Sequence, residues 1–331
     1  MIKDIKGLHH VTSMAADAAI NNRFFTDTLG LRRVKKTVNF DAPEVYHLYY
    51  GDEAGTPGSV MTYFPFPHAR RGRAGSGEVS TTAFAVPEGT LDAWEARLGE
   101  AGVPGLERVN TFGENRLLFQ GPDGDGLALV EADDDRAPWS GNGIGANTAL
   151  RGFHSVELRL RDTGPTADLL GLMGYQEECR QGNVTRFVLP AHNGAGTVDL
   201  AQVDAPQADQ GAGSVHHIAF AVDDLDRGVG FDFAALDAAD ADHAQVAVVV
   251  QRGDLHLEQA VLFHFGRRYA VDDGLEQEGH VVAELVRFRA GHAVEGGGVD
   301  HREVELLVGG AEVVEQIEDL VDDPVRARAG T

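Results

Sequence analysis

A pair of adjacent histidines recurs at two distant places in this chain, each time inside a short alternating β-strand pattern. Leu-His-His-Val at residues 8–11 returns as Val-His-His-Ile at residues 215–218. Imidazole is the commonest side-chain ligand for transition metals in proteins. Two matched pairs therefore indicate a metal centre built across two copies of one structural unit, and a fold that brings those copies together.

The order strand, helix and three strands is predicted several times along the 331 residues. Three copies cover 7–66, 79–133 and 152–203, and a fourth begins at Val215 and matches poorly after about Asp226. Repeats of one supersecondary unit bury their apolar faces against each other. The sequence therefore predicts an α+β fold of four tandem βαβββ units in two paired domains, 1–140 and 149–331.

Two helices are predicted with particular ends and faces. The first runs from Asp17 to Leu29, with Ile20 and Phe24 on one face. The second begins after Thr90, whose hydroxyl can cap it, and carries Leu91, Trp94 and Leu98 on one face.

The composition limits the classes of partner. The net charge is −24, from 52 acidic and 28 basic residues, and the four lysines all lie within the first 36 positions. Such a surface repels nucleic acid and anionic membranes, and it is typical of a protein from a salt-rich cytosol. We expect a cytoplasmic protein, because the chain shows no signal peptide, no apolar run long enough to span a bilayer and a single cysteine, Cys179.

Four stretches carry a resemblance to a known family, at 7–12, 46–58, 151–155 and 213–220. The stretch 46–58, YHLYYGDEAGTPG, is the longest of them. Together they resemble the vicinal oxygen chelate superfamily, which includes the glyoxalases and extradiol dioxygenases. Within it, the chain is most similar to ring-cleaving dioxygenases of the hydroquinone 1,2-dioxygenase type, over roughly residues 5–225.

The resemblance implies a metal site of two histidines and one carboxylate. The histidines map onto His10 and His217, and the metal implied is Fe(II), with Mn(II) left open. The carboxylate is expected about fifty residues after His217, where the chain offers none. Glu284, in an apolar run, is the first candidate for it and Glu258 the second. This ligand set leaves three octahedral positions open for substrate hydroxyls and dioxygen.

Further residues are candidates for the proton chemistry of ring cleavage. His47, Tyr46 and His154 could take the substrate proton or donate to the oxygen that attacks the ring. Because successive side chains of a strand point to opposite faces, only one histidine of each pair can reach the site, and we expect the other, such as His9, to pack between units or to form a hydrogen bond. His154 opens the third unit and Asp199 closes it, which leaves a second site, between units two and three, open as an alternative. Thr81, a poor ligand, holds the matching place in the second unit.

Three functions are consistent with these residues. The leading one is an Fe(II)-dependent dioxygenase that takes a small aromatic substrate and dioxygen, in the degradation of aromatic compounds. A glyoxalase-like metal-dependent lyase or isomerase would keep the ligands and need no oxygen. A non-catalytic protein of the same fold would bind a small molecule only. The sequence predicts no nucleic-acid or membrane partner and leaves open whether the chain forms a homo-oligomer.

The repeat pattern and the third ligand are lost at one place, close to Asp226. Either the fourth unit has diverged, or the residues after about 226 are not in the family's natural reading frame. An intact mass equal to the 35.4 kDa of this sequence would contradict the second hypothesis.

Overall fold

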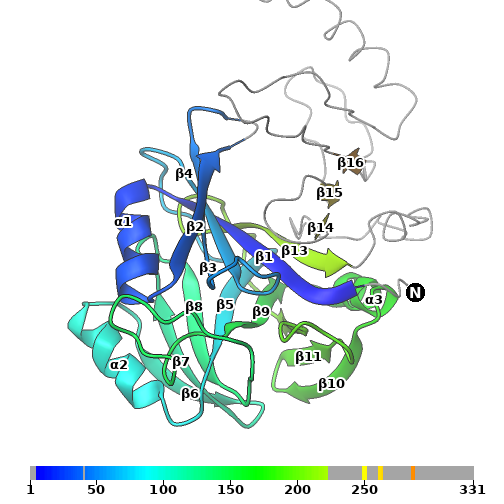
Figure 1. Ribbon diagram of the computed structural model, residues 1–331. Coiled ribbons are helices and arrows are strands. Elements are labelled where there is room, and N and C mark those ends of the chain that lie inside the picture. The colour runs from blue at the N-terminus through cyan, green and yellow to red at the C-terminus, as the bar shows by residue number, and fades with distance from the viewer. Residues whose placement is uncertain (1–4, 40–41, 223–247, 252–259, 264–284, 288–331) are drawn as a thin grey trace, which may run out of the picture.

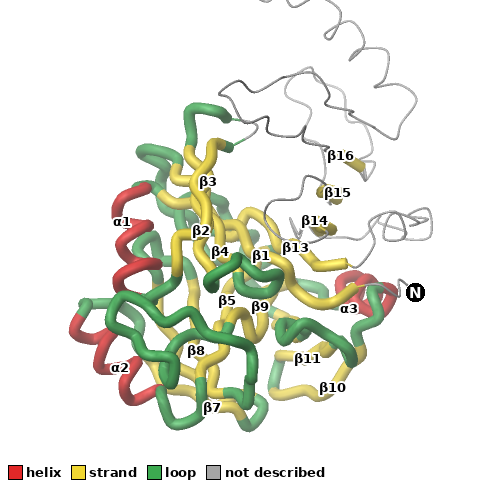
Figure 2. The backbone as a smooth tube through the Cα atoms, viewed as in Figure 1, coloured by secondary structure: helices red, strands yellow, loops and turns green. Residues whose placement is uncertain are grey.

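Two eight-stranded β-sheets form the fold (Figure 1). The computed structural model describes residues 5–39, 42–222, 248–251, 260–263 and 285–287, the last three segments as backbone only. The first sheet has the order β16-β15-β14-β13-β1-β4-β3-β2, and the second has the order β10-β11-β12-β9-β5-β8-β7-β6. The α-helices lie on the outside of these sheets (Figure 2).

The first three units have the predicted element order. The first comprises β1 (Ile5–Ala15), α1 (Ala18–Arg23), a π-helical turn η1 (Phe24–Thr28), β2 (Arg32–Val38), β3 (Tyr46–Gly51) and β4 (Val60–Pro65). The second comprises β5 (Glu78–Val86), α2 (Leu91–Glu100), β6 (Glu107–Thr111), β7 (Glu114–Gln120) and β8 (Gly126–Glu131). The third comprises β9 (Gly152–Leu160), α3 (Gly164–Leu172), β10 (Gln176–Gln181), β11 (Val184–Val188) and β12 (Thr197–Gln202). The described strands of the fourth are β13 (Val215–Val222), β14 (Val248–Gln251), β15 (Ala260–Phe263) and β16 (Leu285–Arg287).

The units pair one with four and two with three. Strand β1 runs antiparallel to β13 in the first sheet, and β5 runs antiparallel to β9 in the second. In Figure 1 the yellow-green β13 lies beside the blue β1. Each sheet therefore contains strands from both sides of the segment 134–148, which lies between β8 and β9. The α+β fold of tandem βαβββ units is confirmed, and the domain boundaries stay a prediction.

The first two helices differ in detail from the prediction. Asp17 caps α1, since its Oδ1 atom accepts from the N–H groups of Ala19 and Ile20, each at 2.8 Å. The chain continues into η1, where the Leu29 N–H donates to the Phe24 carbonyl. Ile20 and Phe24 are one α-helical turn apart, as predicted, but Phe24 is buried in the core while Ile20 is 47% exposed.

The apolar face predicted for α2 is confirmed, but the predicted cap at Thr90 is not. Leu91, Trp94 and Leu98 are buried. The Thr90 hydroxyl, however, donates to the carbonyl of Pro87 at 2.6 Å and makes no cap hydrogen bond. The helix therefore depends on its packing more than on its first residue. Among the described residues, no helix combines the length and apolar content that a bilayer span requires.

A buried hydrogen bond joins the two sheets. The Tyr63 hydroxyl on β4 donates to Asp125 Oδ2 at 2.6 Å, just before β8. Burial raises the pKa of Asp125 to about 6, against the opposing effect of this hydrogen bond. The folded protein therefore binds a proton at Asp125 more tightly than the unfolded chain does.

This difference predicts a pH dependence of stability. An unfolded aspartate has a pKa of about 3.9, so Asp125 stabilises the fold fully below about pH 4. That contribution is lost as the pH rises to about 6, by about 2–3 kcal/mol. In Asp125→Asn, which keeps an acceptor for Tyr63, this loss should be absent. Urea unfolding between pH 4 and 8 measures it, with Glu88→Gln on an exposed turn as the control. Parallel profiles for Asp125→Asn and the wild type would contradict the assignment.

Candidate metal centre

The two histidines predicted as ligands meet at the centre of the first sheet. Their Nε2 atoms, from His10 on β1 and His217 on β13, lie 3.1 Å apart. Two nitrogens bound at right angles, each about 2.1 Å from one metal ion, would be about 3.0 Å apart. His10 is 9% exposed and lies in the middle of its strand. The pair therefore has the spacing of two adjacent ligands of one ion.

The first histidine of each pair orients the second. His9 Nδ1 lies 3.0 Å from His10 Nδ1, and His216 Nδ1 lies 2.8 Å from His217 Nδ1. Metal-bound histidines usually have their other ring nitrogen held by a hydrogen-bond partner, a place that His9 and His216 take here. With Nδ1 held, Nε2 of His10 and of His217 is directed toward the shared position.

His9 takes one of the two roles expected for it, a hydrogen bond, but strict alternation would have placed its ring on the face opposite His10. The pairing of β1 with β13 shifts register between Leu8 and His10, and again between Thr12 and Ser13. Such irregularities bend the strand and redirect side chains. Strict alternation therefore fails where the histidines lie, and neighbouring rings come into contact.

The electrostatics of the site favour neutral imidazoles. Burial, followed by the neighbouring His9, His217 and His47, holds the pKa of His10 well below its ordinary value. A neutral imidazole keeps the lone pair that a metal needs. The donor chemistry of the pair therefore fits a divalent transition metal.

The third ligand is not found among the described residues. No group of three or more His, Cys, Asp or Glu side chains in that part of the chain is arranged to hold an ion. Glu258 and Glu284, the candidates from the sequence, lie outside the described residues. Strand β16, which begins at Leu285, is the edge strand of the same sheet.

A row of hydrogen-bonded polar side chains extends from His217 across four strands. Thr12 Oγ1 lies 3.0 Å from His217 Nε2 and 2.7 Å from Thr62 Oγ1. Thr62 Oγ1 lies 2.9 Å from His47 Nε2, and His47 Nδ1 lies 2.7 Å from the Tyr49 hydroxyl. We call Thr12, Thr62, His47 and Tyr49 the polar row. The structure thus links His47, a predicted catalytic residue, to the histidine pair through two threonines.

Tyr46, another predicted catalytic residue, lies elsewhere. It is 46% exposed, and the Lys36 ammonium lies 3.7 Å from the centre of its ring. Alternation along β3 places Tyr46 on the face opposite His47 and puts Tyr49 on the same face as His47. The tyrosine beside His47 is therefore Tyr49, and the two-residue spacing from His47 is the signal that could have found it.

His154 lies in the second sheet, in a separate cluster of charged side chains. Its Nε2 atom is 3.1 Å from Glu114 Oε1, and Arg186 Nη1 is 2.9 Å from the same oxygen. Arg186 also binds Asp199 with two hydrogen bonds of 2.8 and 2.9 Å. With Arg116, these residues form what we call the ion cluster. His154 and Asp199 do share a site, as the sequence suggested, but two arginines fill it.

The ion cluster and the polar row hold equivalent places in their sheets. In the first sheet, Thr12 on β1 lies between its strand partners His217 on β13 and Thr62 on β4. In the second sheet, Glu157 on β9 lies between Thr81 on β5 and Asp199 on β12 in the same arrangement. Along the next strand, Arg186 pairs with Asp199 as Tyr49 pairs with Thr62. Thr81 therefore takes the place of His217, as the sequence repeat predicted, and charged groups replace the neutral row.

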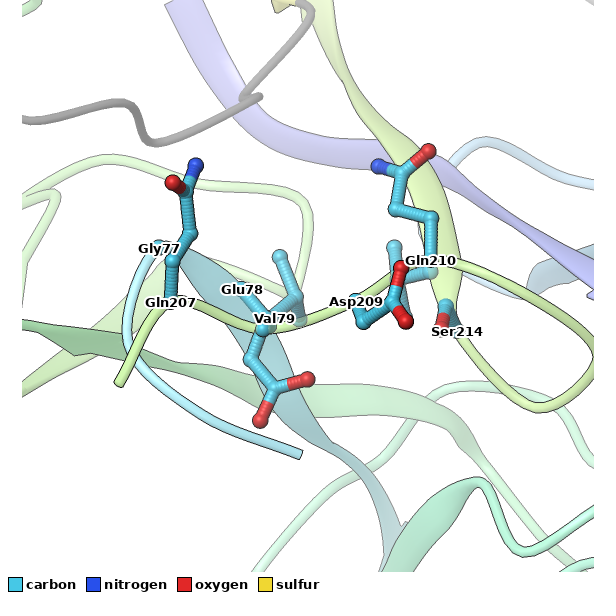
Figure 3. A pocket seen from close by; sticks show the side chains of 9 residues that line it. Gly77, Glu78, Val79, Gln207, Asp209, Gln210 and Ser214 are labelled. Carbon is cyan, nitrogen blue, oxygen red and sulfur yellow. The ribbon is translucent and has the colours of Figure 1, made fainter. Parts of the chain in front are cut away.

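A cavity of about 250 Å³ lies near the start of β13 (Figure 3). Its lining includes Glu78 from β5, Asp209 from the preceding linker and Val215. Asp209 is held by Arg70 in a two-bond ion pair of 2.8 Å each. None of the four paired histidines lines this cavity, so it is distinct from the histidine site.

Comparison with known proteins places this geometry in a family. Residues 7–129 match the model of the glyoxalase/bleomycin resistance protein/dioxygenase superfamily. The Bacillus subtilis protein MhqO, named as a ring-cleaving dioxygenase, is 37% identical over 226 residues, which are 68% of this chain and 72% of MhqO. The chain belongs to this superfamily. Within the superfamily, its relatives carry the names of ring-cleaving enzymes.

Two more superfamily members support the same grouping. The chlorohydroquinone/hydroquinone 1,2-dioxygenase of Sphingobium indicum is 36% identical over 232 residues, which cover 67% of this chain and 72% of that enzyme. A crystal structure described as a dioxygenase from Bacillus subtilis superposes with a TM-score of 0.68 at 33% identity, over 79% of this chain and 83% of that one. The fold and the resemblance predicted from the sequence are both confirmed.

Proposed function

We propose that the chain is an Fe(II)-dependent, extradiol-type ring-cleaving dioxygenase that acts on a hydroquinone or catechol. The observation that carries the proposal is the 3.1 Å approach of His10 Nε2 to His217 Nε2, each ring held from behind by a second histidine. The names of the relatives support an aromatic substrate and dioxygen as the reactants. Mn(II) accepts the same ligands and is the alternative metal.

Different residues of the chain would have different roles in such a reaction. A bound Fe(II) would supply adjacent binding positions for the diol and dioxygen, and the electron transfer between them. His10 and His217 would hold that ion, while His9 and His216 orient the two imidazoles. The Thr12 hydroxyl, 3.0 Å from His217 Nε2, lies within reach of a molecule bound beside that histidine.

His47 contributes as a neutral group. Burial, then the charge of Lys35 and the nearby His216, lower the pKa of His47 to about 3. A histidine with this pKa accepts a proton only when it can pass one on at the same time. This property argues for transfer of the substrate proton through His47, and against storage of the proton on it.

The third ligand is proposed to be a carboxylate from the segment after residue 226. Glu284 is the first candidate and Glu258 the second, as the sequence indicates. Glu284→Gln and Glu258→Gln, each tested for Fe(II) binding, distinguish the two. If both variants bind iron as tightly as the wild type does, water or another residue completes the site.

Oxygen uptake tests the proposed function directly. The protein is loaded with Fe(II) without oxygen and mixed with hydroquinone or catechol in aerobic, high-salt buffer. The expected result is uptake of one dioxygen per diol, with a ring-opened acid as the product. Metal-dependent conversion of a substrate without oxygen uptake would favour a glyoxalase-like lyase or isomerase. Diol binding with no product would favour a non-catalytic binding protein.

A further inference from the structure

The polar row is continuous from the histidine pair to the outer part of the first sheet. Five contacts of 2.7 to 3.1 Å connect His10, His217, Thr12, Thr62, His47 and Tyr49 in that order. Thr12 and Thr62 are both fully buried. Tyr49, at the outer end, is partly exposed. The row thus leads from a buried site toward the surface.

Every member of the row can both accept and donate a hydrogen bond. Threonine and tyrosine hydroxyls have one donor and two acceptor positions, and a neutral imidazole has one of each. Burial raises the pKa of Tyr49 to about 12, against a smaller effect of the Thr37 hydroxyl, so its proton stays in place at neutral pH. His47 is neutral for the reasons given above. The hydrogen bonds along the row can therefore run in either direction, and no member has to be charged.

We propose that the polar row is a proton path, which carries a hydroxyl proton of the bound diol from Thr12 through Thr62 and His47 to Tyr49. The proposal rests on the proposed function, because it requires a substrate that loses a proton at the histidine pair. It assigns Thr12 as the group that takes the substrate proton, and Thr62 and Tyr49 as residues that relay the proton behind it.

The transfer balances without any stored charge. The substrate O–H bond breaks and its proton goes to Thr12 Oγ1, whose own proton goes to Thr62 Oγ1. The Thr62 proton goes to His47 Nε2, while the Nδ1 proton of His47 passes to the Tyr49 oxygen. Tyr49 releases its original proton to water. The diol is left as its anion, and His47 has changed from one neutral tautomer to the other.

A positive charge at the outer end of the row keeps His47 neutral. The Lys35 ammonium lies 5.6 Å from the centre of the Tyr49 ring. Its charge opposes an imidazolium at His47, so a proton that reaches His47 has to be passed on. In the second sheet, Glu157, Asp199 and Arg186 replace Thr12, Thr62 and Tyr49. The fixed ion pair of Arg186 with Asp199 cannot reverse its direction, so the proton path is a property of the first sheet.

Thr62→Val tests the proposal, since it removes one hydroxyl and keeps the shape of the side chain. The proton released when hydroquinone binds to the Fe(II)-loaded protein without oxygen is followed with a pH indicator in a stopped-flow instrument. We expect Thr62→Val to release it about 100-fold more slowly than the wild type, with unchanged affinity for hydroquinone. Thr62→Ser, which restores a hydroxyl, should recover most of the rate.

The matched control is Thr82→Val. Thr82 is a buried strand threonine in the second sheet, and its hydroxyl has no partner among the described residues. Its variant should release the proton at the wild-type rate. Equally fast release from Thr62→Val would overturn the proton path. A wild-type protein that binds no diol would instead contradict the proposed function.

A second measurement needs neither metal nor substrate. Nitrogen-15 NMR of the His47 imidazole in the metal-free protein should show a neutral ring at pH 7. Its tautomer ratio should change in Thr62→Val and stay the same in Thr82→Val. A charged His47 ring at pH 7, or no change in Thr62→Val, would overturn the proposal whatever the substrate is.

Discussion

His10→Ala and His217→Ala should each lose Fe(II) binding and reduce oxygen uptake to the level of the metal-free protein. Each substitution removes one of the two Nε2 atoms that lie 3.1 Å apart, and one remaining imidazole cannot hold the ion in the same place. The fold should survive, because both side chains are polar and the apolar core of the sheet does not depend on them. Iron content after dialysis, together with oxygen uptake, measures the effect.

Two further histidine variants serve as comparisons. His9→Ala removes the partner of His10 Nδ1 and should weaken metal affinity by about 10- to 100-fold without abolishing it. His68→Asn changes an exposed histidine with a φ of 68°, a backbone angle that asparagine tolerates, and should bind iron normally. Wild-type iron content in His10→Ala would exclude this histidine as a ligand.

Arg186→Met should destabilise the protein by about 3–5 kcal/mol, because it leaves a buried carboxylate without its main partner. The Arg186 and Asp199 side chains are only 4% and 2% exposed. Burial raises the pKa of Glu114, but His154, Arg116 and Arg186 outweigh that effect and hold its pKa below the ordinary value. The ion cluster is therefore coupled, and the loss of one cation affects both carboxylates. Urea unfolding at pH 7 gives the free energy.

Two further variants distinguish the effect of losing a charge in a buried ion pair from the effect of losing one at the surface. Arg108→Met breaks an ion pair at the surface, with Asp92 and Glu95, and should cost no more than about 1 kcal/mol. The double variant Arg186→Met, Asp199→Leu replaces the pair by apolar groups and should recover much of the stability. If Arg186→Met costs no more than Arg108→Met, the ion cluster does not stabilise the fold.

The sequence predicted the elements of the fold because local pattern is sufficient to define them. The βαβββ order, the buried face of the second helix and the equivalence of Thr81 with His217 all follow from spacing along the chain. The pairing of unit one with unit four was implied by the two histidine pairs. The π-helical turn that follows α1 was missed, since its residues, Phe24–Thr28, include no proline or glycine.

The site was predicted only in part, for physical reasons that differ between residues. His10 and His217 carry a repeated and chemically distinctive signal. Thr12 and Thr62 carry none, because a threonine in a strand is ordinary until its partner across the sheet is known. The contact of His9 with His10 depends on shifts in strand register, which alternation cannot predict. The contact of His154 with Glu114 could not be predicted, since the folding of the second sheet brings the two residues together from distant parts of the sequence.

The equivalence of the two sheets has a consequence for stoichiometry. Both sheets present a polar centre at matching strand positions, but the second is already supplied with cations by Arg116 and Arg186, which belong to the polypeptide and cannot dissociate. The first sheet offers neutral imidazoles and hydroxyls instead. On the proposed function, each chain would therefore take up one metal ion, in the first sheet, and not two.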